Sequence, residues 1–142
     1  MHTRRYIFAL DEKAYAYSNF IQVVKSKTAA GFVPNFSSAG QKSVDRTEPA
    51  IGANVLLKLY NKFGDRWLVE LLFDDLLDWH DWFVAFRVLQ PAGLLCLGSN
   101  SVEGDSYENP NTMSSARLES GMDNSPSWDG EFFNTTTHQM GL

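Results

Sequence analysis

The sequence predicts an all-α fold whose helices are joined by long active-site loops. Apolar residues recur every three or four positions over three long segments, as on the buried face of a helix. Two long stretches between them are rich in Gly, Pro, Ser and Asn, which favour turns. With 142 residues, 44% of them hydrophobic and 20% charged, the chain has the balance of one modest globular domain.

The first helix is expected to follow Asp11, a plausible N-cap, and to fade near Lys27. Its apolar face is formed by residues at helical spacing: Ala14, Tyr17, Ile21 and Val24. Residues 28–45 then form an irregular stretch, and a loop of this length inside a compact domain is usually functional.

The second helix is predicted to start near Thr47, which can cap it, with Pro49 tolerated in the first turn. Gly64 is a natural stop. A tight turn then leads to a third helix, which begins at Asp65 and runs to about Val88.

The third helix is apolar around most of its girth. One face carries Leu68, Leu72, Leu76, Trp79, Phe83 and Phe86. Further apolar residues flank that face: Val69, Phe73 and Leu77. Such a helix is expected to be packed on more than one side.

Beyond Pro91 the pattern becomes irregular. Residues 93–97 predict a short strand or an extended entry segment, residues 98–112 a polar loop, and residues 114–119 a short helix. No periodicity follows from Gly121 onwards. If the two long loops gather at one end of the helices, they can form the rim of a pocket.

Composition excludes several classes of function. The net charge of −5 leaves no basic stripe for tracking nucleic-acid phosphates. No apolar run approaches the roughly 20 residues of a membrane segment. A single cysteine, Cys96, excludes an intrachain disulfide, and the three histidines are scattered, so no metal site and no cofactor is predicted. Aromatic residues, 13% of the chain, suit either a large core or a carbohydrate site.

Residues 117–129 are the richest in chemistry. Three carboxylates, Glu119, Asp123 and Asp129, lie near Trp128, and Gly121 lets the backbone turn sharply. A carboxylate beside an indole can be kept protonated by desolvation and like charge, as a glycosidase acid requires. A solvated acidic loop is the alternative.

A second candidate lies in the first long loop. Asp45 and Arg46 could clamp sugar hydroxyls, while Phe32 or Phe36 could stack on a sugar ring. Alternatively, Asp45 and Thr47 cap the second helix and Arg46 pairs with an acid.

These segments resemble one enzyme family. Residues 119–126 read Glu-Ser-Gly-Met-Asp-Asn-Ser-Pro, which resembles the Glu-Ser-Gly-X-Asp-Asn-Ser-Pro signature of glycoside hydrolase family 63 and its trehalase-like relatives. Residues 31–35 and 45–49 are similar to the substrate-side loop of that catalytic domain, and residues 79–83 to the end of the intervening helix. The family includes mannosyl-oligosaccharide glucosidases and mannosylglycerate hydrolases. The three blocks occur in the family's order.

The resemblance implies that residues 1–142 are part of a catalytic domain truncated at both ends. That domain is an (α/α)6 barrel, or six-hairpin toroid, and its remaining part, or a partner, would cover the apolar faces. Asp123 falls on the general acid of an inverting mechanism acting on α-glucosides or mannosylglycerate-like substrates. The implied substrate-binding residues are Phe32, Asn35, Asp45, Arg46, Glu119, Asn124 and Trp128. Glu48 departs from the Gln of many relatives.

The resemblance also places the catalytic base on a later helix, with no counterpart before Leu142. The isolated chain is therefore expected to have little or no hydrolase activity. Two other functions stay open: a non-catalytic carbohydrate-binding fragment and a helical interaction protein. The compartment is open as well. The lack of a signal sequence favours the cytoplasm, while the two-lobed eukaryotic relatives act in the secretory pathway.

Overall fold

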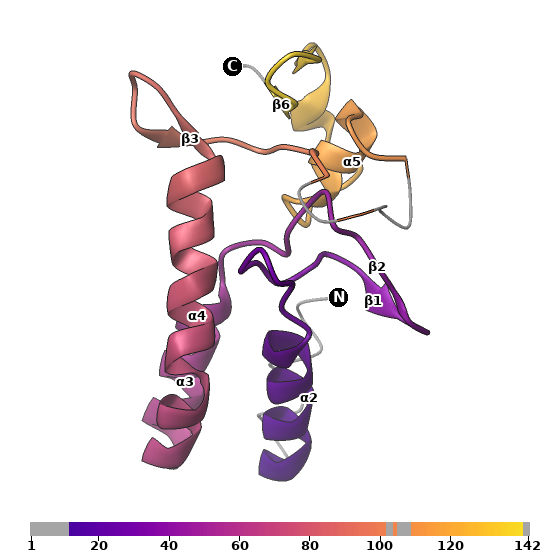
Figure 1. Cartoon of the computed structure of the whole chain (residues 1–142). Coiled ribbons are helices and arrows are strands. Elements are labelled where there is room, and N and C mark those ends of the chain that lie inside the picture. Colours follow the sequence, from indigo (N-terminus) through magenta and orange to yellow (C-terminus); the bar gives the residue numbers. More distant parts are fainter. Residues whose placement is uncertain (1–11, 102–103, 105–108, 141–142) are drawn as a thin grey trace.

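Helices form most of the regular structure in the computed structural model, which describes residues 12–101, 104 and 109–140 (Figure 1). In this part of the chain the helices are α2 (Lys13–Lys25), α3 (Gly52–Phe63), α4 (Arg66–Phe86) and α5 (Met113–Leu118). The helical prediction is thereby confirmed. The first helix ends two residues before its predicted limit, and its predicted cap, Asp11, lies outside the described residues.

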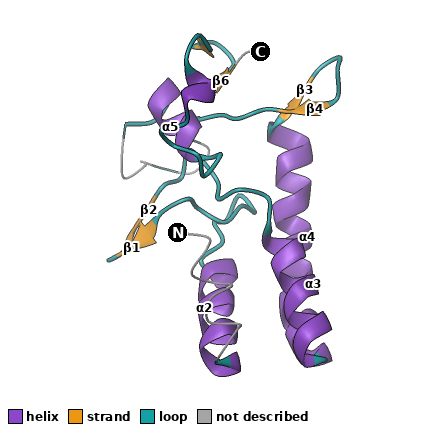
Figure 2. Cartoon of the chain, turned by 180° about the vertical axis from the view of Figure 1, so that it is seen from behind, coloured by secondary structure: helices purple, strands orange, loops and turns teal. Residues whose placement is uncertain are grey.

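Within the described residues, six two-residue strands form three separate antiparallel hairpins, and the strands are drawn as arrows in Figure 2. They pair β1 (Ser37–Ser38) with β2 (Gln41–Lys42), β3 (Val88–Leu89) with β4 (Leu94–Leu95), and β5 (Phe133–Asn134) with β6 (Gln139–Met140). Only β4 was predicted, as the short strand after Pro91. Pairs of two residues are too short to produce an alternating pattern in the sequence. The same applies to the short 3₁₀ turn η1 (Pro126–Trp128).

The main core lies where α2 and α3 both contact α4. It consists of side chains from the inner faces of the three helices: Ala16, Tyr17, Phe20, Val24, Val55, Leu56, Leu59, Leu68 and Leu72. A second core cluster near the carboxyl end of α4 joins Phe32 and Val33 to Trp79, Trp82 and Phe83. This second cluster anchors the first long loop on the helix.

Other faces of α4 remain apolar and exposed. Their large side chains are 42–57% exposed: Trp67, Leu71, Phe73, Leu77, Val84 and Phe86. Both α2 and α3 contact α4, but Phe73 and Leu77 of its flanking apolar residues are 57% and 46% exposed, so packing on more than one side stays a prediction. No helix in the described ranges combines the length and apolarity needed to cross a membrane.

The predicted start of the second helix was wrong. α3 begins at Gly52, five residues after Thr47, and Thr47 does not cap it. Its hydroxyl donates to the Val33 carbonyl oxygen (2.9 Å), and its backbone N–H donates to Oε2 of Glu119 (2.9 Å). These long-range partners hold residues 47–51 outside the helix.

Glycine sets both ends of α3. A Cβ on Gly52 would lie 2.6 Å from Cζ3 of Trp79, so only glycine allows the helix to start this close to α4. Gly64 adopts a left-handed φ of 73°, and its N–H donates to the Tyr60 carbonyl (2.8 Å). The predicted stop at Gly64 is therefore confirmed.

Polar contacts also tie α2 to α4. Nζ of Lys25 lies 2.6 Å from Oδ2 of Asp75, and Nζ of Lys27 lies 3.0 Å from Oδ1 of the same carboxylate. At the other end, the Tyr17 hydroxyl donates to Oδ2 of Asp65 (2.7 Å). The hydrogen bonds from Lys13 and Tyr17 lower the pKa of Asp65.

The pairing of Asp75 predicts a loss of stability in acid. Burial raises the pKa of the Asp75 carboxyl, but the hydrogen bonds from Lys25 and Lys27 outweigh burial and lower it below 3.8. A depressed carboxyl stabilises the fold above its unfolded pKa, and this stabilisation is lost as the pH falls through the folded value. We expect the free energy of unfolding to fall below pH 3.8, and Asp75→Asn to reduce this acid-side loss.

Urea unfolding across the acidic range measures this effect. Asp74→Asn is the matched control, since Asp74 is the exposed neighbour of Asp75 on α4. Equal acid dependence in the Asp75→Asn and wild-type chains would contradict the role of this pairing.

Candidate active site

The two long loops meet beyond the carboxyl half of α4, where α5 and β6 also lie (Figure 1). Nδ2 of Asn35, in the first loop, donates to the Leu118 carbonyl oxygen at the end of α5 (3.0 Å). The N–H of Asn100, in the second loop, donates to the Asp45 carbonyl oxygen in the first loop (2.8 Å). Their predicted gathering at one end of the helices is confirmed.

We call the region where the two loops meet α5 the junction. Glu119 is its polar centre, and the Glu119 side chain is 1% exposed. Besides Thr47, the carboxylate accepts hydrogen bonds from Nε of Arg87 (2.6 Å), Nη2 of Arg87 (2.9 Å) and the N–H of Gly98 (3.1 Å). Burial raises the pKa of Glu119, and these donors oppose that shift. Four donors from three segments thus converge on one carboxylate.

Asp45 and Arg46 form a second buried pair beside it. Nη1 of Arg46 lies 3.0 and 3.1 Å from the two carboxylate oxygens of Asp45, and the Ser99 hydroxyl donates to Oδ2 of Asp45 (2.7 Å). Both side chains are at most 1% exposed. The expected pairing of Arg46 with an acid occurs here, and that acid is Asp45. Binding of sugar hydroxyls by these two residues stays a prediction.

The predicted stacking residue Phe32 lies in the second core cluster. Its side chain is fully buried, and its ring centroid lies 4.6 Å from that of Trp82. Asn35 is half-buried and bonded to the end of α5. Phe32 therefore packs against α4 and Asn35 contacts the end of α5, and their contact with a sugar stays a prediction.

After Glu119, local hydrogen bonds hold the loop that carries Asp123, the acid loop (residues 119–128). Gly121 turns the chain at a φ of 71°, and the N–H of Met122 donates to the Ser120 hydroxyl (2.9 Å). Nε1 of Trp128 closes the loop by donating to the Met122 carbonyl oxygen (2.7 Å). Asp123 is exposed within this closed loop, which matches the solvated acidic loop given as the alternative and not the desolvated carboxylate.

A groove of about 910 Å³ borders the acid loop. Glu119, Ser120, Met122 and Trp128 line it from the acid loop, together with residues of the β3–β4 and β5–β6 hairpins. Its lining is largely apolar with a few polar groups, the usual character of a small-molecule site. Asp123 and Asn124 follow the lining residue Met122 in the sequence and are exposed, but neither of them lines the groove.

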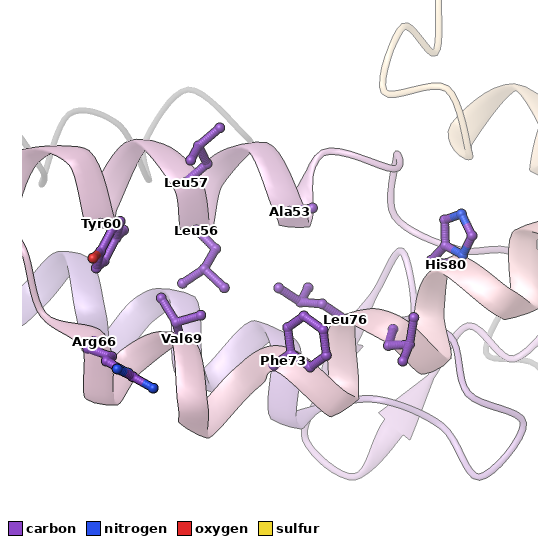
Figure 3. Close-up of a pocket in the computed structure, with 10 residues that line it drawn as sticks. Ala53, Leu56, Leu57, Tyr60, Arg66, Val69, Phe73, Leu76 and His80 are labelled. Carbon is purple, nitrogen blue, oxygen red and sulfur yellow. The ribbon is translucent and has the colours of Figure 1, made fainter.

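A separate groove of about 610 Å³ runs between α3 and α4 (Figure 3). Its apolar floor includes Leu56, Val69 and Phe73, and Arg66 and His80 lie towards its opposite ends. Among the residues that the structure describes, those lining this groove include no carboxylate, unlike those of the groove beside the acid loop.

Arg87 is the site residue that the sequence did not reveal. Arg87 directly follows α4, and the sequence around it forms no recognisable motif. Its partner Glu119 lies 32 positions away. In the ranges that the structure describes, no group of three His, Cys, Asp or Glu side chains is placed to hold a metal ion.

One family model matches residues 6–140, and its description is the mannosylglycerate hydrolase MGH1-like glycoside hydrolase domain. The match covers the helices, the first loop and the acid loop together. The resemblance identified from the sequence motifs is thereby confirmed. No curated protein and no solved structure matches the chain.

The buried hydrogen bond between Thr47 and Trp79 is expected to stabilise the junction. Nε1 of Trp79 donates to the Thr47 hydroxyl (2.7 Å), and both residues are buried. Thr47→Val keeps the shape but leaves the indole N–H without this acceptor, so we expect a loss of about 1–3 kcal/mol in the free energy of unfolding.

Urea unfolding measures the loss. The control is Thr135→Val at an exposed position, where the change should stay within about 0.5 kcal/mol. Equal effects of the two substitutions would contradict the proposed contribution.

Proposed function

The chain belongs to the mannosylglycerate hydrolase MGH1-like glycoside hydrolase domain family, and we propose that it serves glycosidic-bond hydrolysis with Asp123 as the general acid. Family membership supports the reaction class. The choice of Asp123 rests on the signature in residues 119–126 and on the form of the acid loop.

One observation carries this assignment: the acid loop is anchored at Glu119 and closed at Trp128, while Asp123 between them is exposed. A general acid needs a backbone that stays in place and a carboxyl group that can reach the substrate. Met122 and Trp128, on either side of Asp123, line the groove of about 910 Å³. The proposal requires the Asp123 carboxyl group to turn towards a sugar bound in that groove.

The mechanism we propose is a single displacement. Asp123 gives its proton to the glycosidic oxygen as the bond from that oxygen to the anomeric carbon breaks. A second carboxylate, about 6.5–9.5 Å from the first, takes a proton from a water molecule that attacks the opposite face of the sugar. The product therefore has the inverted anomeric configuration.

The proposed substrates are α-glycosides, either α-glucosides or mannosylglycerate, the compound named in the family's description. Trp128 lines the groove and offers an aromatic face for the apolar side of a sugar ring. Asn124, exposed beside Asp123, supplies an amide for sugar hydroxyls. Glu119 lines the same groove, whereas Phe32, Asp45 and Arg46 are buried, so their proposed part in sugar binding, like that of Asn35, is to support the site.

We further propose that residues 1–142 form part of an (α/α)6 barrel. The exposed apolar side chains of α4 would then face the rest of the barrel or a partner. The catalytic base would lie outside these residues, so the chain alone would bind sugar and hydrolyse little or none. The second candidate function is sugar binding alone, with no catalysis even when the rest of the barrel is present.

A nucleophile that needs no base tests Asp123 in the chain as it exists. With an α-glycoside of poor leaving group, we expect no turnover in buffer and slow formation of the β-glycosyl azide when sodium azide is added. Azide attacks the anomeric carbon, and the departing oxygen takes its proton from Asp123. Asp123→Asn should lower the azide-dependent rate by about 10²–10⁴-fold. Proton NMR of the anomeric region measures product and configuration.

Asp129→Asn is the matched control, because Asp129 is another exposed carboxylate six positions along the chain. An equal loss of rate in the two variants, or no azide-dependent turnover in the wild-type chain, would contradict Asp123 as the acid. Hydrolysis without azide would contradict the absence of a base.

Sugar binding is expected to depend on Trp128. Trp128→Ala removes the aromatic face from the groove, and the affinity for the sugar should fall about tenfold, which corresponds to about 1.4 kcal/mol. Isothermal calorimetry measures the affinity. Trp67→Ala, which alters a half-exposed indole on α4, should leave it unchanged. A larger loss of affinity in Trp67→Ala than in Trp128→Ala would exclude the groove as the sugar site.

A further inference from the structure

We infer that Arg87 is a positioning residue that fixes the acid loop, an assignment that rests on the proposed function of Asp123. Arg87 directly follows α4 as its C-cap residue, and its side chain is 1% exposed. It makes no hydrogen bond or ion pair with Asp123, the proposed general acid. Its effect on Asp123 would pass through Glu119 and the backbone of the acid loop.

The guanidinium of Arg87 uses all five of its N–H groups. Nε and Nη2 hold the two oxygens of Glu119 at 2.6 and 2.9 Å. Nη1 donates to Oδ1 of Asn100 (2.8 Å) and to the Phe86 carbonyl oxygen (3.2 Å), and Nη2 also donates to the Asp45 carbonyl oxygen (3.4 Å). One side chain thus joins the end of α4 to both long loops and to Glu119.

The surroundings of Arg87 leave its guanidinium little freedom. Its Cζ lies 4.5 Å from the centroid of the Trp82 ring, a cation–π arrangement. On another side is Gly98, where a Cβ would come within 2.8 Å of the same Cζ. The sequence therefore provides a ring and a glycine that fit the planar group closely.

Lysine could not replace this arrangement. An ammonium is a point charge, whereas the guanidinium fork matches both oxygens of a carboxylate at once. The two-point contact fixes the orientation of Glu119 as well as its distance. Fixing the side chain of Glu119 fixes the first residue of the acid loop.

Beyond Glu119, short hydrogen bonds fix the backbone of the acid loop. The Ser120 hydroxyl donates to the Arg117 carbonyl oxygen (2.6 Å) and accepts from the N–H of Met122 (2.9 Å). Trp128 then bonds to the Met122 carbonyl oxygen (2.7 Å). Asp123 therefore directly follows Met122, whose backbone N–H and carbonyl oxygen are both hydrogen-bonded.

A purely structural role for Arg87 is the competing explanation, and Trp128 distinguishes the two. A local structural defect at Arg87 would disturb Trp82, which it touches, whereas a loss of positioning would also reach Trp128 at the far end of the acid loop. Fluorine NMR of the chain labelled with 5-fluorotryptophan reports each indole separately. Trp128→Phe assigns the signal of Trp128.

We expect Arg87→Lys to shift or broaden the Trp128 signal. The matched control is Arg66→Lys, the same substitution at the first residue of α4, where the exposed Arg66 pairs with Glu70. It should leave the Trp128 signal unchanged. Azide-dependent turnover should show a kcat lowered by about 10- to 100-fold in Arg87→Lys, because the acid is misplaced, and KM should rise as well, because Trp128 lines the groove.

A change at Trp82 with none at Trp128 would overturn the assignment. If Arg87→Lys does not fold, Glu119→Gln gives the same test by NMR, since it keeps the side-chain shape and removes the charge. Loss of folding in both variants would also overturn it, because the pair would then hold the whole fold. Absence of wild-type turnover would count against the proposed function alone, and the Trp128 signal would still decide the role of Arg87.

Discussion

The buried carboxylate of Glu119 is the interaction on which the candidate site depends. A charge removed from water is tolerated only when donors surround it, and here the Arg87 guanidinium and the backbone N–H groups of Thr47 and Gly98 do so. These donors come from segments far apart in the sequence. The first loop, the segment after the β3–β4 hairpin and the acid loop are therefore held together by the need to satisfy one charge.

This arrangement divides the site residues into two groups. Glu119, Asp45, Arg46 and Phe32 are buried and bonded or packed within the chain, whereas Asp123 and Asn124 are exposed. The buried residues build a fixed support, and the exposed ones remain available to a ligand. Trp128 belongs to both groups, since it closes the acid loop and lines the groove. In the proposed function, the support orients Asp123 towards a sugar in that groove.

The sequence predicted what local patterns determine. Gly64 and the apolar periodicity that follows it placed α4 almost to the residue, and the polar loop before α5 placed that short helix. The start of α3 was predicted wrongly, because Thr47 is held by Glu119, 72 positions away, and no local feature reports such a partner. Arg87 was missed for the same reason. The acid loop was found only because its signature resembles a known family, since a short acidic loop carries little information by itself.

The exchange of two backbone amide protons tests the central claim most directly. The N–H groups of Thr47 and Gly98 lie in irregular segments, and each donates to the Glu119 carboxylate. Amide hydrogen exchange followed by NMR should show both protons protected to the same degree as core amides of α4. Exchange of either proton at the rate of an unstructured loop would show that the junction at Glu119 is not formed.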